Sequence, residues 1–246
     1  MVIIMKNGVC LLLTALLCIF CLAGCGNKAA DAPAEETADT HKPSIHWRVD
    51  TTGKYLEDNT VGCIICVEAT SKNCARVLMY EKSQTDGKTV WTNTLKCDGV
   101  IGLNGLGKTK EGDNMTPIGD FGITEAFGIK ENPGTSIRYV DITEDIYCCG
   151  DETAYNQLID IKDYPHDCAD GEHMSEYTPE YNYGLFIDYN KEGTMGLGSA
   201  IFFHCQGANT YTGGCIAVDE DCMIQILQAA DANTRIIIDY APDYAE

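Results

Sequence analysis

Short apolar runs separated by turn-forming residues constrain the fold of this chain more than any other feature. Runs rich in β-branched and aromatic side chains recur from residue 62 onward, with Gly, Asn or Asp between them. They cover residues 62–69, 75–81, 89–97, 121–124, 137–142, 183–189, 200–204, 215–218 and 235–240. The stretch 83–88 contains Asp86-Gly87, which is typical of a hairpin turn. Many short strands with tight turns predict a mostly β fold, a β-sandwich or barrel, with one or two short helices.

Two segments show helical periodicity. Residues 220–232 carry apolar side chains at helical spacing, namely Met223, Ile226, Leu227 and Ala230. Asp219 precedes them and is expected to be the N-cap. This helix is expected to pack on the core. A weaker helical pattern covers residues 152–161.

The first 24 residues have the features of a secretory signal peptide. Lys6 precedes an uncharged apolar run that is shorter than the roughly 20 residues needed to cross a bilayer. The run ends Leu-Ala-Gly-Cys25, which resembles the lipobox of bacterial lipoproteins. That resemblance implies lipidation of Cys25 and an extracytoplasmic lipoprotein anchored to the membrane of a bacterial cell envelope. An uncleaved membrane anchor is the alternative.

The remaining chain divides into a tether and one domain. Residues 25–58 begin with a polar stretch rich in Ala, Asp, Glu and Pro, which predicts a flexible acidic tether. Residues 59–246 have the size of a single folded domain. The formal net charge of −20 argues against nucleic acid as a partner and against electrostatic adhesion to anionic lipid.

A formal nucleotide-binding motif is present but is not expected to function. Residues 102–109 match GxxxxGKT, whose chemistry requires a helix directly after the loop. Gly112, Asn114 and Pro117 follow instead, and these residues do not begin a stable helix. We therefore expect no bound nucleotide.

The spacing of the cysteines and histidines indicates neither a defined disulfide framework nor a metal site. Fourteen cysteines are present, and outside the cytoplasm such thiols can pair, but their spacing defines no connectivity. Cys63 and Cys66 would point to opposite faces of one strand, so free buried thiols are expected there. His166, Cys168 and His173 lie close in sequence without a metal-ligand framework, so neither a metal nor a cofactor is expected. His173 either forms local hydrogen bonds or lines a cleft.

The strongest chemical signal is a histidine followed by a cysteine. An apolar run ends on His204, and Cys215 follows Thr212-Gly213-Gly214. A thiol and an imidazole can act as a nucleophile and its base. Each residue alone has a structural interpretation, as a core histidine or as a small apolar side chain. Glycines before the thiol leave backbone N–H groups free to face an oxyanion, and Thr212 can fix the turn.

The segment from His204 to Cys215 resembles the active-site motif of the L,D-transpeptidase catalytic domain, also called the YkuD domain. Thr212-Gly213-Gly214-Cys215 is similar to its Ser/Thr-x-Gly-Cys pattern. Residues 108–121 resemble the family's KxGDxxTPxGxF segment, and the stretches 172–174, 188–190 and 198–204 add to the resemblance, which spans about residues 60–240. The chain departs from the family pattern at three points. Gly213 stands where many members have histidine, and Ile216-Ala217 stands just after the cysteine, where members have Arg or Asn. The spacing between His204 and Cys215 is also shorter than is usual in the family.

The resemblance implies a mostly β catalytic domain with a cleft at one end of its sheet. It implies a peptidoglycan L,D-transpeptidase that cross-links stem peptides through an acyl-thioester. Cys215 would be the nucleophile and His204 the base, which would make the thiolate available near neutral pH. Thr212, Gly213 and Gly214 would form the turn and the oxyanion site, with the N–H groups of Gly214 and Cys215 as donors to the oxyanion. The substrate-binding residues would be His173, Lys110 and Asp113. The cations that attract the substrate carboxylates would be Lys108, Lys110 and Arg138.

Three other functions stay open. Water could resolve the same thioester, which would make the protein an L,D-carboxypeptidase or endopeptidase on stem peptides. A non-catalytic lipoprotein that binds wall peptide is the second alternative, and the departures near Gly213 favour it. A zinc-dependent hydrolase is the third, and the irregular ligand spacing disfavours it.

Overall fold

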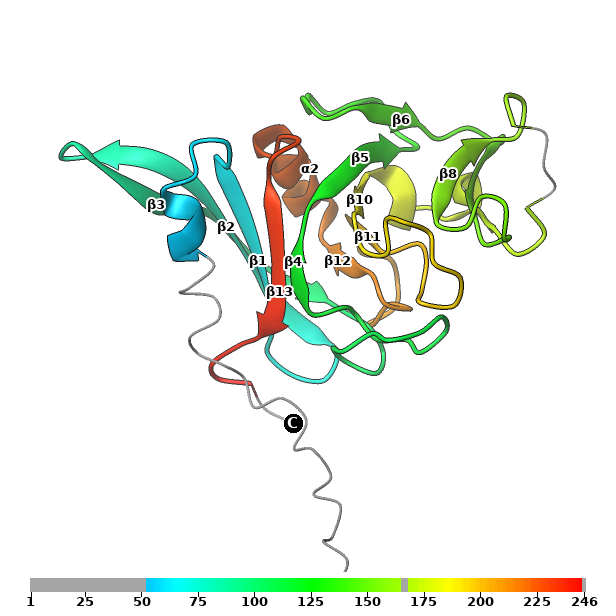
Figure 1. Cartoon of the computed structure of the whole chain (residues 1–246), viewed down its shortest axis with the longest axis horizontal. Helices are drawn as coiled ribbons and strands as arrows, with labels where there is room; N and C mark the ends of the chain where they lie inside the picture. Colours follow the sequence, from blue (N-terminus) through cyan, green and yellow to red (C-terminus); the bar gives the residue numbers. More distant parts are fainter. Residues whose placement is uncertain (1–51, 165–167, 245–246) are drawn as a thin grey trace, which may run out of the picture. The chain divides into compact units, whose positions relative to one another are not determined.

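A ten-stranded mixed sheet forms most of this computed structural model, which describes residues 52–164 and 168–244 (Figure 1). Along the sheet the strands are β4 (Gly119–Phe121), β13 (Arg235–Tyr240), β1 (Cys63–Ala69), β2 (Cys74–Thr85), β3 (Lys88–Val100), β12 (Ile216–Val218), β11 (Phe202–Cys205), β10 (Gly184–Ile187), β5 (Ile123–Gly128) and β6 (Tyr139–Asp141). A three-stranded sheet has the order β8 (Gln157–Asp160), β7 (Ile146–Cys149) and β9 (Glu172–His173). The predicted mostly β fold is confirmed.

The large sheet closes on itself through a single residue. Strand β4 stands at one end of the strand order and β5 next to the other end. Only Gly122 separates the two strands in the chain. The first strand of the order therefore continues directly into β5 near the opposite end, and the Asp188 carboxylate accepts the Gly122 N–H at 2.7 Å at this junction. The sheet thus curls like a barrel, which is how such structures protect edge strands.

The core follows the alternation of side chains along each strand. On β1, Cys63, Ile65 and Val67 face the largest cluster, together with side chains of β2, β10, β11, β12 and β13. Ile64 and Cys66 face a second cluster on the other side of the sheet. Cys63 and Cys66 therefore point to opposite faces, as expected, and both side chains are buried.

Helical structure is short. Helix α2 (Glu220–Ala229) buries Met223, Ile226 and Leu227 against the largest cluster, which confirms the predicted helix. Asp219 is its N-cap residue, but its side chain forms no capping hydrogen bond. Two 3-10 turns, η1 (Met174–Glu176) and η2 (Glu180–Asn182), and a helical stretch at residues 52–56 complete the described helices. None of the described helices is long and apolar enough to span a bilayer.

Several local predictions match closely. Strand β13 has the predicted bounds, and the predicted hairpin joins β2 to β3. Asp86 and Gly87 have φ values of 50° and 73°. Positive φ at both central residues defines the type I′ turn, which suits the twist of a two-stranded hairpin.

The helix expected over residues 152–161 is wrong. This segment contains turns and the strand β8. Asn156 adopts a φ of 62°, which interrupts a helix. Its side-chain amide donates to the Tyr189 and Asn190 carbonyls and its oxygen accepts the Ala200 N–H, at 2.9 to 3.0 Å. These long-range bonds outweigh the local helical pattern.

The folded part begins before the expected boundary at residue 59. Tyr55 is 6% exposed and packs with Val61 and Ile237. Its hydroxyl donates to the Asp120 carboxylate at 2.6 Å. Residues 52–58 therefore belong to the domain and not to a tether. The expected signal peptide, Cys25 and the tether up to residue 51 lie outside the described residues.

Candidate functional site

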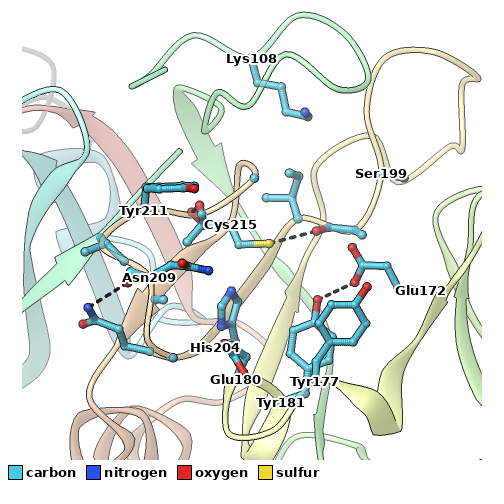
Figure 2. A pocket seen from close by; sticks show the side chains of 18 of the residues that line it. Lys108, Glu172, Tyr177, Glu180, Tyr181, Ser199, His204, Asn209, Tyr211 and Cys215 are labelled. Atoms are coloured by element: carbon cyan, nitrogen blue, oxygen red, sulfur yellow. Dashed lines mark hydrogen bonds between the residues drawn. The ribbon is translucent and has the colours of Figure 1, made fainter. Parts of the chain in front are cut away.

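Two adjacent parallel strands bring His204 and Cys215 to one cavity. Strand β11 pairs with β12, with His204 opposite Ala217, and Cys215 lies directly before β12. The Phe202 N–H donates to Cys215 Sγ at 3.3 Å. Phe203 and Cys205 on β11 face the largest core cluster, and His204 between them therefore faces the other side of the sheet. Both side chains line a cavity of about 310 Å³ (Figure 2).

The hydrogen bond of His204 defines its tautomer. Nδ1 lies 2.7 Å from the Cys205 carbonyl oxygen, which only accepts, so Nδ1 carries the proton. Nε2 then keeps its lone pair. Burial lowers the pKa of His204 despite the carbonyl contact and the nearby Glu180 carboxylate. A neutral imidazole with a free lone pair is the form that can accept a proton.

The thiol of Cys215 is held in its protonated form. Its Sγ donates to the Ala200 carbonyl at 3.1 Å, and within the described part of the chain no hydrogen bond joins it to His204. Burial, helped by the Glu172 carboxylate, raises the pKa of Cys215 to about 12, although Lys108 and the Phe202 N–H act in the opposite direction. The raised pKa therefore disfavours the expected thiolate near neutral pH, because apolar neighbours and a nearby carboxylate both oppose a negative charge on sulfur.

Thr212 holds the turn before the nucleophile. Its hydroxyl donates to the Cys215 carbonyl at 2.7 Å and accepts the Gly214 N–H at 3.1 Å. Thr116, from the segment that resembles KxGDxxTPxGxF, also donates to the Cys215 carbonyl, at 3.2 Å. The Gly214 N–H is thus occupied and departs from its expected oxyanion role. Among the described residues, the N–H groups of Gly213 and Cys215 have no acceptor, which leaves them available to a ligand.

The two glycines of this turn differ in what they tolerate. Gly214 has a φ of +142°, and a Cβ there would lie 2.9 Å from the Met115 carbonyl oxygen. At Gly213 the nearest atom is Asn114 Oδ1 at 4.0 Å.

We expect Gly214→Ala to lower the free energy of unfolding by about 1–3 kcal/mol, because it strains the backbone and crowds a carbonyl. The matched variant Gly213→Ala has space for its methyl group and is expected to change stability by less than about 0.5 kcal/mol. Chemical denaturation of the two variants checks this, and equal losses would contradict it.

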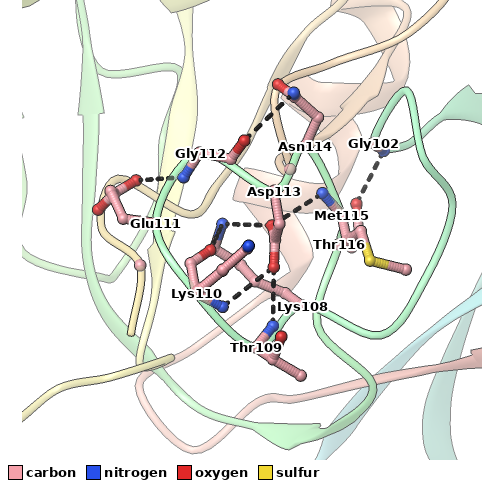
Figure 3. A network of polar contacts seen from close by, with 12 residues as sticks. Gly102, Lys108, Thr109, Lys110, Glu111, Gly112, Asp113, Asn114, Met115 and Thr116 are labelled. Carbon is pink, nitrogen blue, oxygen red and sulfur yellow. Dashed lines mark hydrogen bonds and ion pairs between the residues drawn. The ribbon is translucent and has the colours of Figure 1, made fainter. Parts of the chain in front are cut away.

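Asp113 organises the loop that carries Lys108 (Figure 3). Its carboxylate accepts the N–H groups of Thr109, Lys110 and Met115 at 2.8, 3.0 and 3.1 Å, and Lys108 Nζ at 3.0 Å. Burial raises the pKa of Asp113, but these four donors outweigh it and hold the pKa below its usual value. Asp113 therefore shapes the loop and does not line the cavity.

Of the three expected cations, Lys108, Lys110 and Arg138, Lys108 lines the cavity and the other two do not. Lys108 Nζ donates to Asp113 and to the Lys110 carbonyl at 3.2 Å, which leaves one of its three N–H bonds free. The Lys110 side chain is exposed and does not line the cavity. Arg138 pairs with Glu125 and also lies outside the lining. No helix follows Thr109, so the formal nucleotide motif lacks the structure that such a site needs.

His173 is satisfied locally and does not line the cavity. In β9 its ring stacks on Tyr147 with 4.5 Å between centroids. Its ring nitrogens contact the Glu144 carbonyl at 2.7 Å and the Glu176 carboxylate at 3.0 Å. Its neighbour Glu172 lines the cavity instead. The expected substrate-binding role of His173 is thus not supported by its position.

Sequence analysis missed the aromatic and acidic wall of the cavity. Tyr181 on η2 donates its hydroxyl to Glu172 Oε2 at 2.5 Å, and its ring meets the His204 ring edge-on at 5.5 Å. Tyr177 and Ser199 also line this cavity. The stretches 172–174 and 198–204, which contain Glu172 and Ser199, resemble the L,D-transpeptidase domain, but this resemblance assigns no role to either residue.

Among the described residues, no group of three or more His, Cys, Asp or Glu side chains is arranged to hold a metal ion. Six of the described cysteines are buried, namely Cys63, Cys66, Cys148, Cys149, Cys168 and Cys205.

Comparison with known proteins gives few relatives. No protein-family model matches the chain, and no curated protein matches it. Among solved structures, the helical cell shape determining protein Pgp2 from Campylobacter jejuni is 17% identical, with 80% of this chain and 57% of that one covered and a TM-score of 0.38. The Ldtfm–avibactam carbamoyl enzyme is 14% identical, with 73% and 49% covered and a TM-score of 0.33. The chain spans about half the length of these two proteins.

Proposed function

We propose that the protein is a cysteine acyltransferase that acts on the stem peptides of peptidoglycan, as an L,D-transpeptidase. The observation that carries the chemistry is the presence, in the lining of one cavity, of the Cys215 thiol and of a neutral imidazole whose Nε2 has no hydrogen-bond partner among the described residues. The resemblance of residues 108–121 and 198–215 to the L,D-transpeptidase domain supplies the substrate class. The resemblance of Leu-Ala-Gly-Cys25 to a lipobox supports an extracytoplasmic location, with the lipid as membrane anchor.

The first step transfers a proton from Cys215 to His204. The thiol must turn from the Ala200 carbonyl toward Nε2, and the proton moves as sulfur attacks the peptide carbonyl. A concerted transfer avoids a free thiolate, which a pKa of about 12 would make rare. The protonated His204 then gives its proton to the leaving amine, and an acyl-thioester remains on Cys215.

Charge in the cavity supports binding of a substrate carboxylate near Lys108. The cavity is also lined by Glu111, Glu172 and Glu180, so it repels anions except where the ammonium group lies. The free N–H of Lys108 can donate to a carboxylate, and the N–H groups of Gly213 and Cys215 can donate to the oxyanion that develops at the attacked carbonyl.

Intact-mass analysis of the folded domain tests this proposal. After incubation with tetrapeptide stems or with a carbapenem, we expect one covalent adduct on the wild type and none on Cys215→Ala. Cys74→Ala is the control, because Cys74 is exposed and does not line the cavity. A wild type without an adduct, or an equal adduct on Cys215→Ala, would overturn the proposal. Release of the acyl group by water alone would identify the carboxypeptidase alternative.

A further inference from the structure

A second hollow adjoins the candidate nucleophile. It has a volume of about 460 Å³ and shares Glu111, Glu172, Ser199 and Ala200 with the first cavity. The Ala200 carbonyl is the group that accepts the Cys215 thiol. An acyl group on Cys215 would therefore lie at the junction of the two hollows, where a molecule bound in the second could reach it.

The second hollow is acidic. Glu111, Asp170 and Glu172 line it, and its described lining contains no Lys, Arg or His. Glu111 accepts hydrogen bonds only from neutral groups, namely the Tyr155 hydroxyl, the Ser199 hydroxyl at 2.8 Å and the Gly112 N–H at 3.3 Å. Among the described residues none of the three carboxylates forms an ion pair. A cationic ligand would supply the charge that this hollow lacks.

Glu172 lines both hollows, and Figure 2 shows its carboxylate next to the Tyr181 hydroxyl. Its Oε2 accepts the Tyr181 hydroxyl, whereas its Oε1 accepts no hydrogen bond from a described residue. Burial, together with the Glu111 carboxylate, raises the pKa of Glu172 although the Tyr181 hydroxyl opposes this. A carboxylate with a raised pKa is a stronger base than an ordinary one.

We propose that the second hollow binds an acyl acceptor that carries a protonated primary amine, and that Glu172 removes the proton which makes this amine unreactive. The inference rests on the proposed function, because it requires an acyl group on Cys215. It assigns the acceptor of the second step to this hollow and names the residue that removes the proton from it.

The ammonium group R–NH₃⁺ gives one proton to the Glu172 carboxylate and becomes R–NH₂. Its nitrogen lone pair forms the N–C bond at the thioester carbonyl, and the C–S bond breaks with its electrons on sulfur. The nitrogen gives a second proton to Cys215 through His204, which restores the thiol. Glu172 releases its proton to solvent, and the product is an amide.

The test separates acylation from acyl transfer in Glu172→Gln, which keeps an oxygen for the Tyr181 hydroxyl. Preformed acyl-enzyme is mixed with a peptide that carries a lysine-type amine, or with hydroxylamine, which is uncharged at neutral pH. We expect kcat/KM for the charged amine to fall by about 10²-fold or more, while hydroxylamine reacts at the wild-type rate. Glu172→Asp should recover part of the loss.

Asp170→Asn is the second variant, because Asp170 is exposed and its substitution does not threaten folding. It should raise KM for the charged amine several-fold, and by a larger factor than KM for hydroxylamine, which carries no charge for Asp170 to attract. A Glu172→Gln acyl-enzyme that uses the charged amine as well as the wild type does overturns this inference alone. So does an Asp170→Asn variant with unchanged KM. A wild type that forms no acyl-enzyme overturns the proposed function instead.

Discussion

Replacing His204 by alanine is expected to lower the rate of Cys215 acylation at pH 7 by about 10²–10⁴-fold. Burial raises the pKa of Cys215 to about 12, so roughly one thiol in 10⁵ would be ionised at pH 7 without a base. The imidazole must therefore take the proton during attack. Stopped-flow or quenched mass measurements of adduct formation give the rate, and circular dichroism shows whether the variant is folded.

The pH profile distinguishes a base from a structural histidine. Burial lowers the pKa of His204, so the wild-type rate should rise as pH increases through that pKa and then stay level, because only the neutral ring accepts a proton. In His204→Ala the rate should rise about tenfold per pH unit toward the thiol pKa of about 12. A level profile in His204→Ala, or a wild-type rate in that variant, would contradict the assigned role.

His173→Ala is the matched histidine control. His173 stacks on Tyr147 and lies outside the cavity, so its loss should leave the acylation rate per folded molecule unchanged. A loss equal to that of His204→Ala would mean that the assay reports stability and not chemistry.

Local sequence signals were sufficient for elements whose conformation is decided by near neighbours. The Asp86-Gly87 turn needs positive φ at two residues, and Gly with Asp supplies it at low cost. Helix α2 follows from apolar residues at i, i+3 and i+4 that meet one face of the core. The strand that ends near His204 and the strand that follows Cys215 were both visible as apolar runs, and their parallel pairing brings the two residues to one cavity.

Contacts between distant segments were beyond such signals. The cavity wall joins Glu172, Tyr181 and Ser199, and nothing in the local pattern shows that these residues meet. Residues 157–160 form a strand because they pair with β7. The sequence does not predict β7 itself as a strand. The raised pKa of Cys215 likewise depends on which side chains bury the thiol, and that is a tertiary property.

Asp113→Ala is expected to cause the largest loss of stability among single substitutions near the site, about 3–5 kcal/mol in the free energy of unfolding. The side chains of Lys108 and Asp113 are 2% and 7% exposed. Removing the carboxylate leaves a buried ammonium group without its counter-ion and three backbone N–H groups without their acceptor. Urea denaturation of folded wild type and variant measures the difference.

Lys108→Met provides the matched comparison. It keeps a long side chain, and Asp113 retains its three backbone donors, so the loss of stability should be smaller than for Asp113→Ala. The double variant should lose less than the sum of the two single losses, because it leaves no unpaired charge. Strict additivity would show that the pair does not interact.

The dependence of the free energy of unfolding on pH below about pH 5 tests the role of the Asp113 carboxylate independently. The pKa of Asp113 is lower in the folded protein than the usual value of about 3.9, so the folded state favours the ionised form. Its contribution is therefore complete above about pH 4 and is lost as pH falls through the lower folded pKa. The difference in unfolding free energy between wild type and Asp113→Asn should stay constant from about pH 5 to pH 7 and shrink below about pH 4. A difference that grows on acidification would mean that Asp113 is protonated in the folded loop, and the ion pair with Lys108 would then not hold the loop in place.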